Sequence, residues 1–145
     1  RHAHEIGADC PDLALVQISP YLVEHSQEYV DSGELPDVLA LADVVISRSG
    51  AGTLAELTAL GKPAVFVPLA TSAGNEQAHN ARHLEEVGAA VALVGDVSAD
   101  RLKDAVGPLL TDPGRREAMG QRAREQGRPD AADRLVDVLL SAAAG

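Results

Sequence analysis

The sequence predicts an α/β fold, a Rossmann-like parallel sheet flanked by helices, and three observations predict it. Short runs rich in Val, Leu and Ile alternate with segments whose apolar residues recur at helical spacing, which is the pattern of a parallel sheet covered by helices. Two of these runs, 43–47 and 64–68, show no alternation of polar and apolar residues, so we expect both of their faces to be buried. Gly61 and Gly88 each stand between a predicted helix and a strand, where a residue with positive φ ends a helix.

Each element follows from this alternation, taken in chain order. The apolar runs predict strands at residues 13–18, 26–30, 43–47, 64–68 and 90–94. The helical spacings predict helices at residues 34–41, 53–60, 76–87, 99–110, 115–126 and 130–143, and Pro and Gly separate the last three. Residues 1–10 resemble the tail of a helix, whereas a doubly wound domain opens with a strand and a phosphate-facing loop. We therefore expect a fragment of a larger protein that lacks the first strand of its domain.

Length and charge limit the class of protein. A chain of 145 residues, 46% of them hydrophobic, is long enough for one core, so we expect one domain over residues 1–145. Its 12 basic and 22 acidic residues give a net charge of −10, which argues against nucleic acid and against an anionic membrane surface as partners. A single cysteine, Cys10, excludes an internal disulfide and fits a reducing compartment. With no apolar run long enough for a membrane span and no signal peptide, we expect a cytoplasmic protein.

The segment from Asp43 to Leu57 is the first candidate site. A buried strand ends, small residues form a tight turn, and a helix begins, which places unpaired backbone N–H groups and the positive end of the helix dipole at the carboxyl edge of the sheet. A phosphate or diphosphate is the natural ligand of such a turn. Gly50 and Gly52 allow the backbone to approach that anion because no side chain intervenes. Small residues also precede many helices that bind nothing, so the pattern alone leaves both interpretations open.

Two charged residues of this segment have alternative roles. Thr53 and Glu56 match the capping-box spacing, in which each side chain bonds the other residue's backbone N–H, and spacing alone favours this over ligand binding. The Glu56 carboxylate could instead accept two hydrogen bonds from a ribose diol. Arg48, at the end of the strand, could pair either with a phosphate or with a nearby acidic side chain.

The segment from Pro68 to Arg82 follows the next strand and is the second candidate site. It emerges at the same carboxyl edge, where open α/β sheets bind ligands. Gln77 and Asn80 are three residues apart near the start of a helix and offer amide groups suited to sugar hydroxyls, although such residues are more often solvated surface. His79 and His83 have a spacing that can bind a metal, but no third ligand accompanies them, so we expect no metal site. We also identify no catalytic base.

These motifs, in this order, resemble a known family. The runs Ala42-Asp43-Val-Val-Ile-Ser-Arg48-Ser49-Gly50-Ala51, Thr53-Leu-Ala-Glu56-Leu, Gly61-Lys-Pro63, Pro68-Leu and Gln77-x-x-Asn80-Ala81 are similar to the carboxyl-terminal domain of the undecaprenyl-diphosphomuramoylpentapeptide N-acetylglucosaminyltransferases, the MurG family. The resemblance is good over residues 27–88 and weaker to the end of the chain. The family's Gly-Gly-Ser phosphate loop is absent here, and a His commonly found near Thr71 is replaced.

The resemblance implies a GT-B glycosyltransferase, in which two Rossmann-like domains face a cleft and this domain holds UDP-N-acetylglucosamine. It implies that Tyr29 and Val30 lie at the uracil, that Ala51, Gly52 and Thr53 lie at the diphosphate, that Glu56 holds the ribose hydroxyls, and that Gln77 and Asn80 hold the N-acetylglucosamine. Arg48 and Ser49 match the motif and are assigned a supporting part.

The resemblance also implies a reaction, inverting transfer of N-acetylglucosamine to a lipid-linked muramoyl-pentapeptide in peptidoglycan precursor synthesis, with no cofactor. The acceptor site and any contact with the inner face of the cell membrane would belong to an amino-terminal domain that is missing, so we expect this chain alone to be inactive. Two alternatives remain open: a UDP-sugar-binding subunit of a split glycosyltransferase, and an enzyme resembling the UDP-N-acetylglucosamine 2-epimerases.

Overall fold

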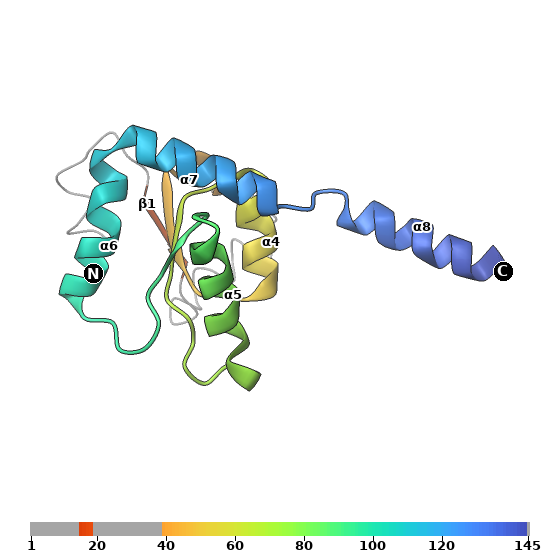
Figure 1. Cartoon of the computed structure of the whole chain (residues 1–145), viewed down its shortest axis with the longest axis horizontal. Helices are drawn as coiled ribbons and strands as arrows, with labels where there is room; N and C mark the ends of the chain where they lie inside the picture. The colour runs from red at the N-terminus through yellow and green to blue at the C-terminus, as the bar shows by residue number, and fades with distance from the viewer. Residues whose placement is uncertain (1–14, 19–38, 145) are drawn as a thin grey trace.

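The computed structural model describes residues 15–18 and 39–144, which form a parallel sheet with helices on both faces (Figure 1). In this described part the sheet has four strands in the order β1-β2-β3-β4, and every neighbouring pair is parallel. The strands are β1 (Leu15–Ile18), β2 (Val44–Ser47), β3 (Ala64–Phe66) and β4 (Val91–Ala92). The helices are α4 (Ala51–Leu60), the 3-10 turn η2 (Ala73–Asn75), α5 (Glu76–Glu86), α6 (Ala99–Thr111), α7 (Pro113–Gln126) and α8 (Ala131–Ala144).

The predicted fold class is confirmed, and the elements agree with the predicted ones to within a few residues. The strand predicted at 26–30 lies outside the described residues, and of the helix predicted at 34–41 only 39–41 are described, in helical conformation. Two helices begin two residues earlier than predicted. Helix α7 begins at Pro113 because a proline fits the first helical position, and the Asp112 carboxylate caps it by accepting from Arg115 N–H at 3.1 Å. Helix α4 begins at Ala51.

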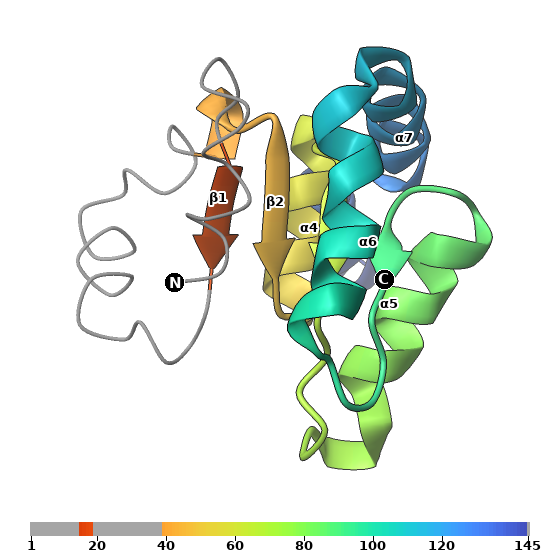
Figure 2. The same cartoon turned by 90° about the vertical axis from the view of Figure 1, so that its left-hand side faces the viewer.

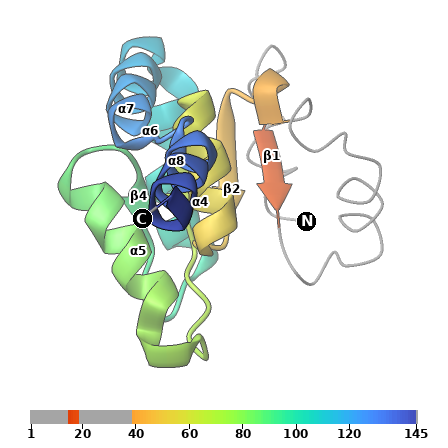
Figure 3. The ribbon, with the colours of Figure 1, turned by 90° about the vertical axis from the view of Figure 1, so that its right-hand side faces the viewer.

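The two central strands are buried on both faces, as predicted. Every residue of β2 and of β3 is buried. Alternate side chains enter two separate cores: Val45, Ala64 and Phe66 belong to one, whereas Val44 and Val65 belong to the other. Helices α4 and α5 cover the first face, which is turned toward the viewer in Figure 3, and α6 covers the second, in front in Figure 2.

Helix α7 closes the amino edge of the sheet and joins the two cores. Its Met119 packs in the core beneath α6, and its Ala123 packs in the core beneath α4 and α5. The turn after α4 lies against α7, and in this turn Gly61 caps α4 with φ 64°. Gly88, just beyond the Val87 cap of α5, has φ 73°. Both predicted positive-φ glycines are therefore confirmed. This arrangement leaves the opposite, carboxyl edge to the loops that follow β2 and β3 (Figure 1).

Helix α8 extends away from the body of the domain (Figure 1). It is amphipathic, and its large apolar side chains are exposed, namely Leu135, Val136, Val138, Leu139 and Leu140. None of the helices in the described residues is both long enough and apolar enough to span a membrane.

Candidate functional site

The amino-terminus of α4 lies at the carboxyl edge of the sheet, directly after β2 (Figure 2). Gly50 is the N-cap residue, and the first intrahelical hydrogen bond runs from Leu54 N–H to the Gly50 carbonyl at 3.0 Å. The N–H groups of Ala51, Gly52 and Thr53 have no acceptor in the part of the chain that the structure describes. Three unpaired amides at the positive end of a helix dipole form a site for an anion.

The space in front of these amides is open. A β carbon added at Gly50 or at Gly52 would meet no atom within 4 Å, and Ala51 and Gly52 are exposed. On that side the backbone of both glycines is therefore not covered by any described residue.

The capping-box interpretation of Thr53 and Glu56 is wrong. Because α4 begins at Ala51, Thr53 is the third helical residue and not the N-cap, and the cap residue Gly50 has no side chain with which to form a cap hydrogen bond. Glu56 is exposed and forms no hydrogen bond or ion pair with any described residue. Its position one turn into the helix, beside the free amides, leaves its carboxylate available to a ligand.

Arg48 bonds to the backbone of the neighbouring strand. Its Nη1 donates to the carbonyl of Val67 at 2.9 Å and to that of Pro68 at 3.3 Å, just beyond β3. Of the two alternatives that the sequence leaves open, an acidic side chain is not among the contacts of Arg48 within the described residues, and the phosphate stays a prediction. The guanidinium instead ties the chain at the end of β2 to the chain at the end of β3, and so fixes the two loops relative to each other.

Ser49 connects the two candidate segments directly. Its side chain is fully buried, and its Oγ donates to the backbone carbonyl of Gln77 at 2.7 Å. Its own carbonyl accepts a hydrogen bond from Asn80 Nδ2 at 3.1 Å. The side-chain Oε1 of Gln77 accepts from Leu69 N–H at 2.9 Å. The turn before α4, the loop after β3 and the first turn of α5 are thus one hydrogen-bonded unit, which we call the Ser49 brace, comprising Ser49, Leu69, Gln77 and Asn80.

The loop that leads into α5 has an unusual backbone. Asn75 has φ 56°, in the left-handed region that few residues other than glycine adopt, and Gly74 beside it has φ 59°. Ser72 holds this turn, because its Oγ accepts from Gln77 N–H at 3.3 Å. Local backbone strain of this kind persists where the surrounding structure enforces it, and it occurs often at ligand sites.

Other predicted residues contribute less. Tyr29 and Val30 lie outside the described residues. His79 and His83 are exposed on α5, and the described part of the chain holds no group of three His, Cys, Asp or Glu side chains that could bind a metal ion.

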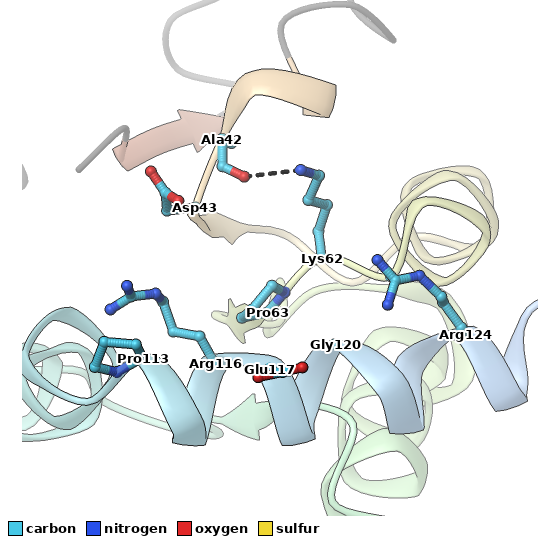
Figure 4. A pocket seen from close by; sticks show the side chains of 10 residues that line it. Ala42, Asp43, Lys62, Pro63, Pro113, Arg116, Glu117, Gly120 and Arg124 are labelled. Atoms are coloured by element: carbon cyan, nitrogen blue, oxygen red, sulfur yellow. Dashed lines mark hydrogen bonds between the residues drawn. The ribbon is translucent and has the colours of Figure 1, made fainter. Parts of the chain in front are cut away.

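A hollow of about 360 Å³ lies at the opposite, amino edge of the sheet, between α7 and the residues that precede β2 and β3 (Figure 4). Two of its cationic side chains, Lys62 and Arg116, donate hydrogen bonds to the backbone. Lys62 Nζ donates to the carbonyls of Ala40 and Ala42, and Arg116 Nη1 donates to that of Leu109 at 2.8 Å. The Gly61-Lys62-Pro63 motif therefore has a structural role, far from the α4 amides.

Sequence reasoning missed Leu69, Ser72 and the bracing role of Ser49. Leu69 contributes only its backbone N–H, so its side chain gives no signal. Ser72 and Ser49 are small polar residues in loops, and their partners become apparent only when the fold brings α5 against the turn after β2.

Known proteins resemble this chain in sequence. The model of the glycosyltransferase family 28 C-terminal domain matches residues 7–135. Among curated proteins, the UDP-N-acetylglucosamine--N-acetylmuramyl-(pentapeptide) pyrophosphoryl-undecaprenol N-acetylglucosamine transferases of Nitrobacter hamburgensis and Oenococcus oeni are 44% identical over 111 residues and 46% identical over 113 residues. These alignments cover 76% and 77% of this chain and 30% of each relative, so the chain spans about three tenths of their length.

Solved structures resemble this chain in fold. A crystal structure of Acinetobacter baumannii MurG superposes with a TM-score of 0.66 at 28% identity, covering 72% of this chain and 30% of that one. The glycosyltransferase VinC, solved in complex with dTDP, has the same TM-score of 0.66 at 19% identity and covers 99% of this chain and 37% of its own, which supports the fold alone. The fold is that of one half of a GT-B glycosyltransferase.

Proposed function

Because this chain belongs to the glycosyltransferase family 28 C-terminal domain family, we propose that it is the donor-binding domain of an inverting transferase, which moves N-acetylglucosamine from UDP-N-acetylglucosamine to a lipid-linked muramoyl-pentapeptide. The names of the relatives support this substrate pair. We place the domain in a two-domain protein whose other domain carries the acceptor site and the membrane contact, at the cytoplasmic face.

One observation carries the proposal: at the carboxyl edge of the sheet, the free amides of α4 directly adjoin the hydrogen-bonded unit that contains the amide side chains of α5. Ser49, whose carbonyl and hydroxyl bond to Asn80 and Gln77, immediately precedes the α4 cap. A nucleoside diphosphate sugar has an anion and a polyol joined by one oxygen, so its site needs an anion-binding turn next to hydroxyl-binding side chains. The described edge of the sheet offers both.

The nucleoside end of the ligand is assigned to the residues beside the amides. The Glu56 carboxylate accepts hydrogen bonds from the two ribose hydroxyls, a role that suits an exposed acidic side chain without a partner among the described residues. Tyr29 and Val30 are assigned to the uracil by resemblance.

The chemistry follows from where charge develops. As the acceptor hydroxyl attacks the anomeric carbon, the bond to the diphosphate breaks and UDP gains negative charge. In this proposal the N–H groups of Ala51, Gly52 and Thr53, which begin α4, face the diphosphate, so they stabilise the transition state more than the ground state. These amides perform the task that a divalent cation performs in other transferases.

The proposal is tested by titrating the chain with UDP-N-acetylglucosamine, UDP-N-acetylgalactosamine, UDP-glucose and ADP-glucose, each with and without EDTA. We expect uridine nucleotides to bind better than the adenine one, with unchanged affinity in EDTA. Glu56→Ala is expected to lower affinity about 10-fold or more, since a hydrogen bond to a charged group contributes about 1.5–3 kcal/mol. Glu125→Ala, an exposed carboxylate on α7, is the matched control and leaves affinity unchanged.

Two outcomes would contradict the assignment. One is equal affinity for ADP-glucose and the uridine nucleotides. The other is a Glu56→Ala variant whose affinity equals that of the Glu125→Ala control.

A further inference from the structure

The Ser49 brace uses one polar atom of each amide side chain on α5 and leaves the other unused. Gln77 accepts a hydrogen bond through Oε1 from Leu69 N–H at 2.9 Å. A backbone N–H can only donate, so it is the oxygen of the carboxamide that must face Leu69. The Gln77 NH2 group is then turned away from it and has no partner in the described part of the chain.

Asn80 has the opposite orientation. Its Nδ2 donates to the Ser49 carbonyl at 3.1 Å. A carbonyl can only accept, so the nitrogen of this carboxamide must face Ser49. The oxygen Oδ1 accepts from no described residue, and the second N–H of Nδ2 also has no described partner. The Ser49 bond keeps the oxygen from facing the Ser49 carbonyl, so it is the oxygen whose orientation is fixed.

Neither amide can reverse without losing its bond. Turning Gln77 over would set an NH2 group against the Leu69 N–H, and turning Asn80 over would set its oxygen against the Ser49 carbonyl. Both side chains are partly buried, and the Ser49 side chain is completely so, which makes such like-to-like contacts costly. The two residues lie three positions apart on α5 and so share a face.

We propose that the Ser49 brace fixes the polarity of the sugar contacts, so that Gln77 presents a hydrogen-bond donor and Asn80 presents an acceptor. This inference depends on the proposed function, which places the sugar at these two residues. The sugar group that faces Gln77 then has to accept a hydrogen bond from the Gln77 NH2 group. The group that faces the Asn80 oxygen has to donate a hydrogen bond, as a hydroxyl at C3, C4 or C6 can.

Fluorine substitution separates these two demands. A carbon-bound fluorine accepts weakly and cannot donate, whereas a deoxy position does neither. At the hydroxyl that faces Gln77, the fluoro analogue therefore recovers part of the affinity that the deoxy analogue loses. At the hydroxyl that faces Asn80, fluorine sets a negative dipole against Oδ1, and the fluoro analogue binds no better than the deoxy one.

The experiment titrates the chain with UDP-N-acetylglucosamine and with its deoxy and deoxyfluoro analogues at C3, C4 and C6, followed by ligand-observed NMR. We expect one position where the deoxy analogue binds about 3- to 10-fold more weakly than the parent and the fluoro analogue recovers part of that loss. We expect a second position where both analogues lose about 10-fold.

A variant assigns the first position to Gln77. In Gln77→Glu one carboxylate oxygen still accepts from Leu69 N–H, but the other cannot donate, so the advantage of fluorine over hydrogen is expected to disappear. The added negative charge lowers the affinity for every UDP-sugar analogue. We therefore compare the affinity of each fluoro analogue with that of its deoxy counterpart, and this ratio is the measured quantity. Gln121→Glu makes the same change on the exposed surface of α7 and is expected to keep the ratio of the unmodified chain.

The outcomes separate the two proposals. If UDP-N-acetylglucosamine binds better than ADP-glucose but no position shows the fluorine advantage, or all three show it, the fixed polarity is wrong and the proposed function stands. A fluorine advantage that survives in Gln77→Glu also overturns it. If UDP-N-acetylglucosamine binds no better than ADP-glucose, both proposals fail.

Discussion

Asn80 and Ser49, thirty-one residues apart in the chain, are joined by a hydrogen bond of 3.1 Å from the Asn80 side chain to the Ser49 carbonyl. The Ser49 hydroxyl returns the contact by donating to the carbonyl of Gln77 at 2.7 Å. The chain that turns into α4 is thereby held to the first turn of α5 at two points. The position of the Gln77 and Asn80 side chains, which we propose bind the sugar, relative to the α4 amides, which we propose bind the diphosphate, depends on this one buried serine.

Replacing that serine tests its positioning role. Ser49→Ala removes the side-chain donor to the Gln77 carbonyl, and we expect the free energy of unfolding to fall by about 0.5–1.5 kcal/mol in urea denaturation. Because α5 is then less firmly held, we also expect the affinity for UDP-N-acetylglucosamine to fall several-fold while the affinity for UDP, which contacts α4, changes little.

The control for this variant is Ser141→Ala. Ser141 also donates to a backbone carbonyl, that of Asp137 at 2.8 Å, but on the exposed surface of α8, so we expect neither stability nor affinity to change. Equal losses of UDP and UDP-sugar affinity in Ser49→Ala would show that the serine supports the whole domain and not the sugar contacts in particular.

A second prediction concerns the start of α4. Since the N-cap is Gly50 and Thr53 forms no cap hydrogen bond, Thr53→Ala is expected to leave the free energy of unfolding within about 0.5 kcal/mol of the original. Ser98 is a true N-cap, because its Oγ accepts from Arg101 N–H at 3.2 Å, and Ser98→Ala is expected to cost about 1 kcal/mol. Urea denaturation of both variants measures the difference. If Thr53→Ala lost as much stability as Ser98→Ala, the capping-box interpretation of Thr53 would be correct after all.

Much of the fold was predictable because its signals are local. The uninterrupted apolar runs at 43–47 and 64–68 predict central strands, and both strands are buried on both faces. Gly61 and Gly88 have the positive φ that their positions after helices predict. The order of strand, turn and helix then places the two candidate segments at one edge of a parallel sheet, which follows from topology alone.

The details of the site were less predictable, because they depend on contacts between distant residues. The sequence does not predict the start of α4 correctly, because the cap is a glycine, which carries no side-chain signal. Thr53 and Glu56, inside the helix, have the spacing of a capping box without forming one. The partners of Arg48 are backbone carbonyls nineteen and twenty residues away, which no spacing rule identifies.

Arg48 is the subject of the third prediction. Arg48→Met removes the donors to two carbonyls beyond β3, so we expect the free energy of unfolding to fall by about 1–3 kcal/mol, with the affinity of the folded variant for UDP within about 3-fold of the original. Arg115→Met, at an exposed position on α7, is the control and is expected to change neither. Unchanged stability together with a large loss of UDP affinity would instead make Arg48 a direct phosphate ligand.

The last prediction concerns the amino edge, where α7 approaches the turn after α4 closely. A β carbon at Gly120 would lie 2.6 Å from the backbone oxygen of Gly61, so Gly120→Ala forces the helix and the turn apart, and we expect a loss of about 1–3 kcal/mol in the free energy of unfolding. Gly107, within α6, has no atom within 4 Å of the same added carbon. Gly107→Ala is therefore expected to stabilise the chain by up to about 1 kcal/mol, because alanine is the better helix former. Urea denaturation should show shifts of opposite sign for these two identical substitutions.

Since Gly120 lies at the edge opposite the α4 amides, the folded Gly120→Ala variant should bind UDP as the original chain does. A loss of UDP affinity in this variant would indicate that the two edges of the sheet are coupled.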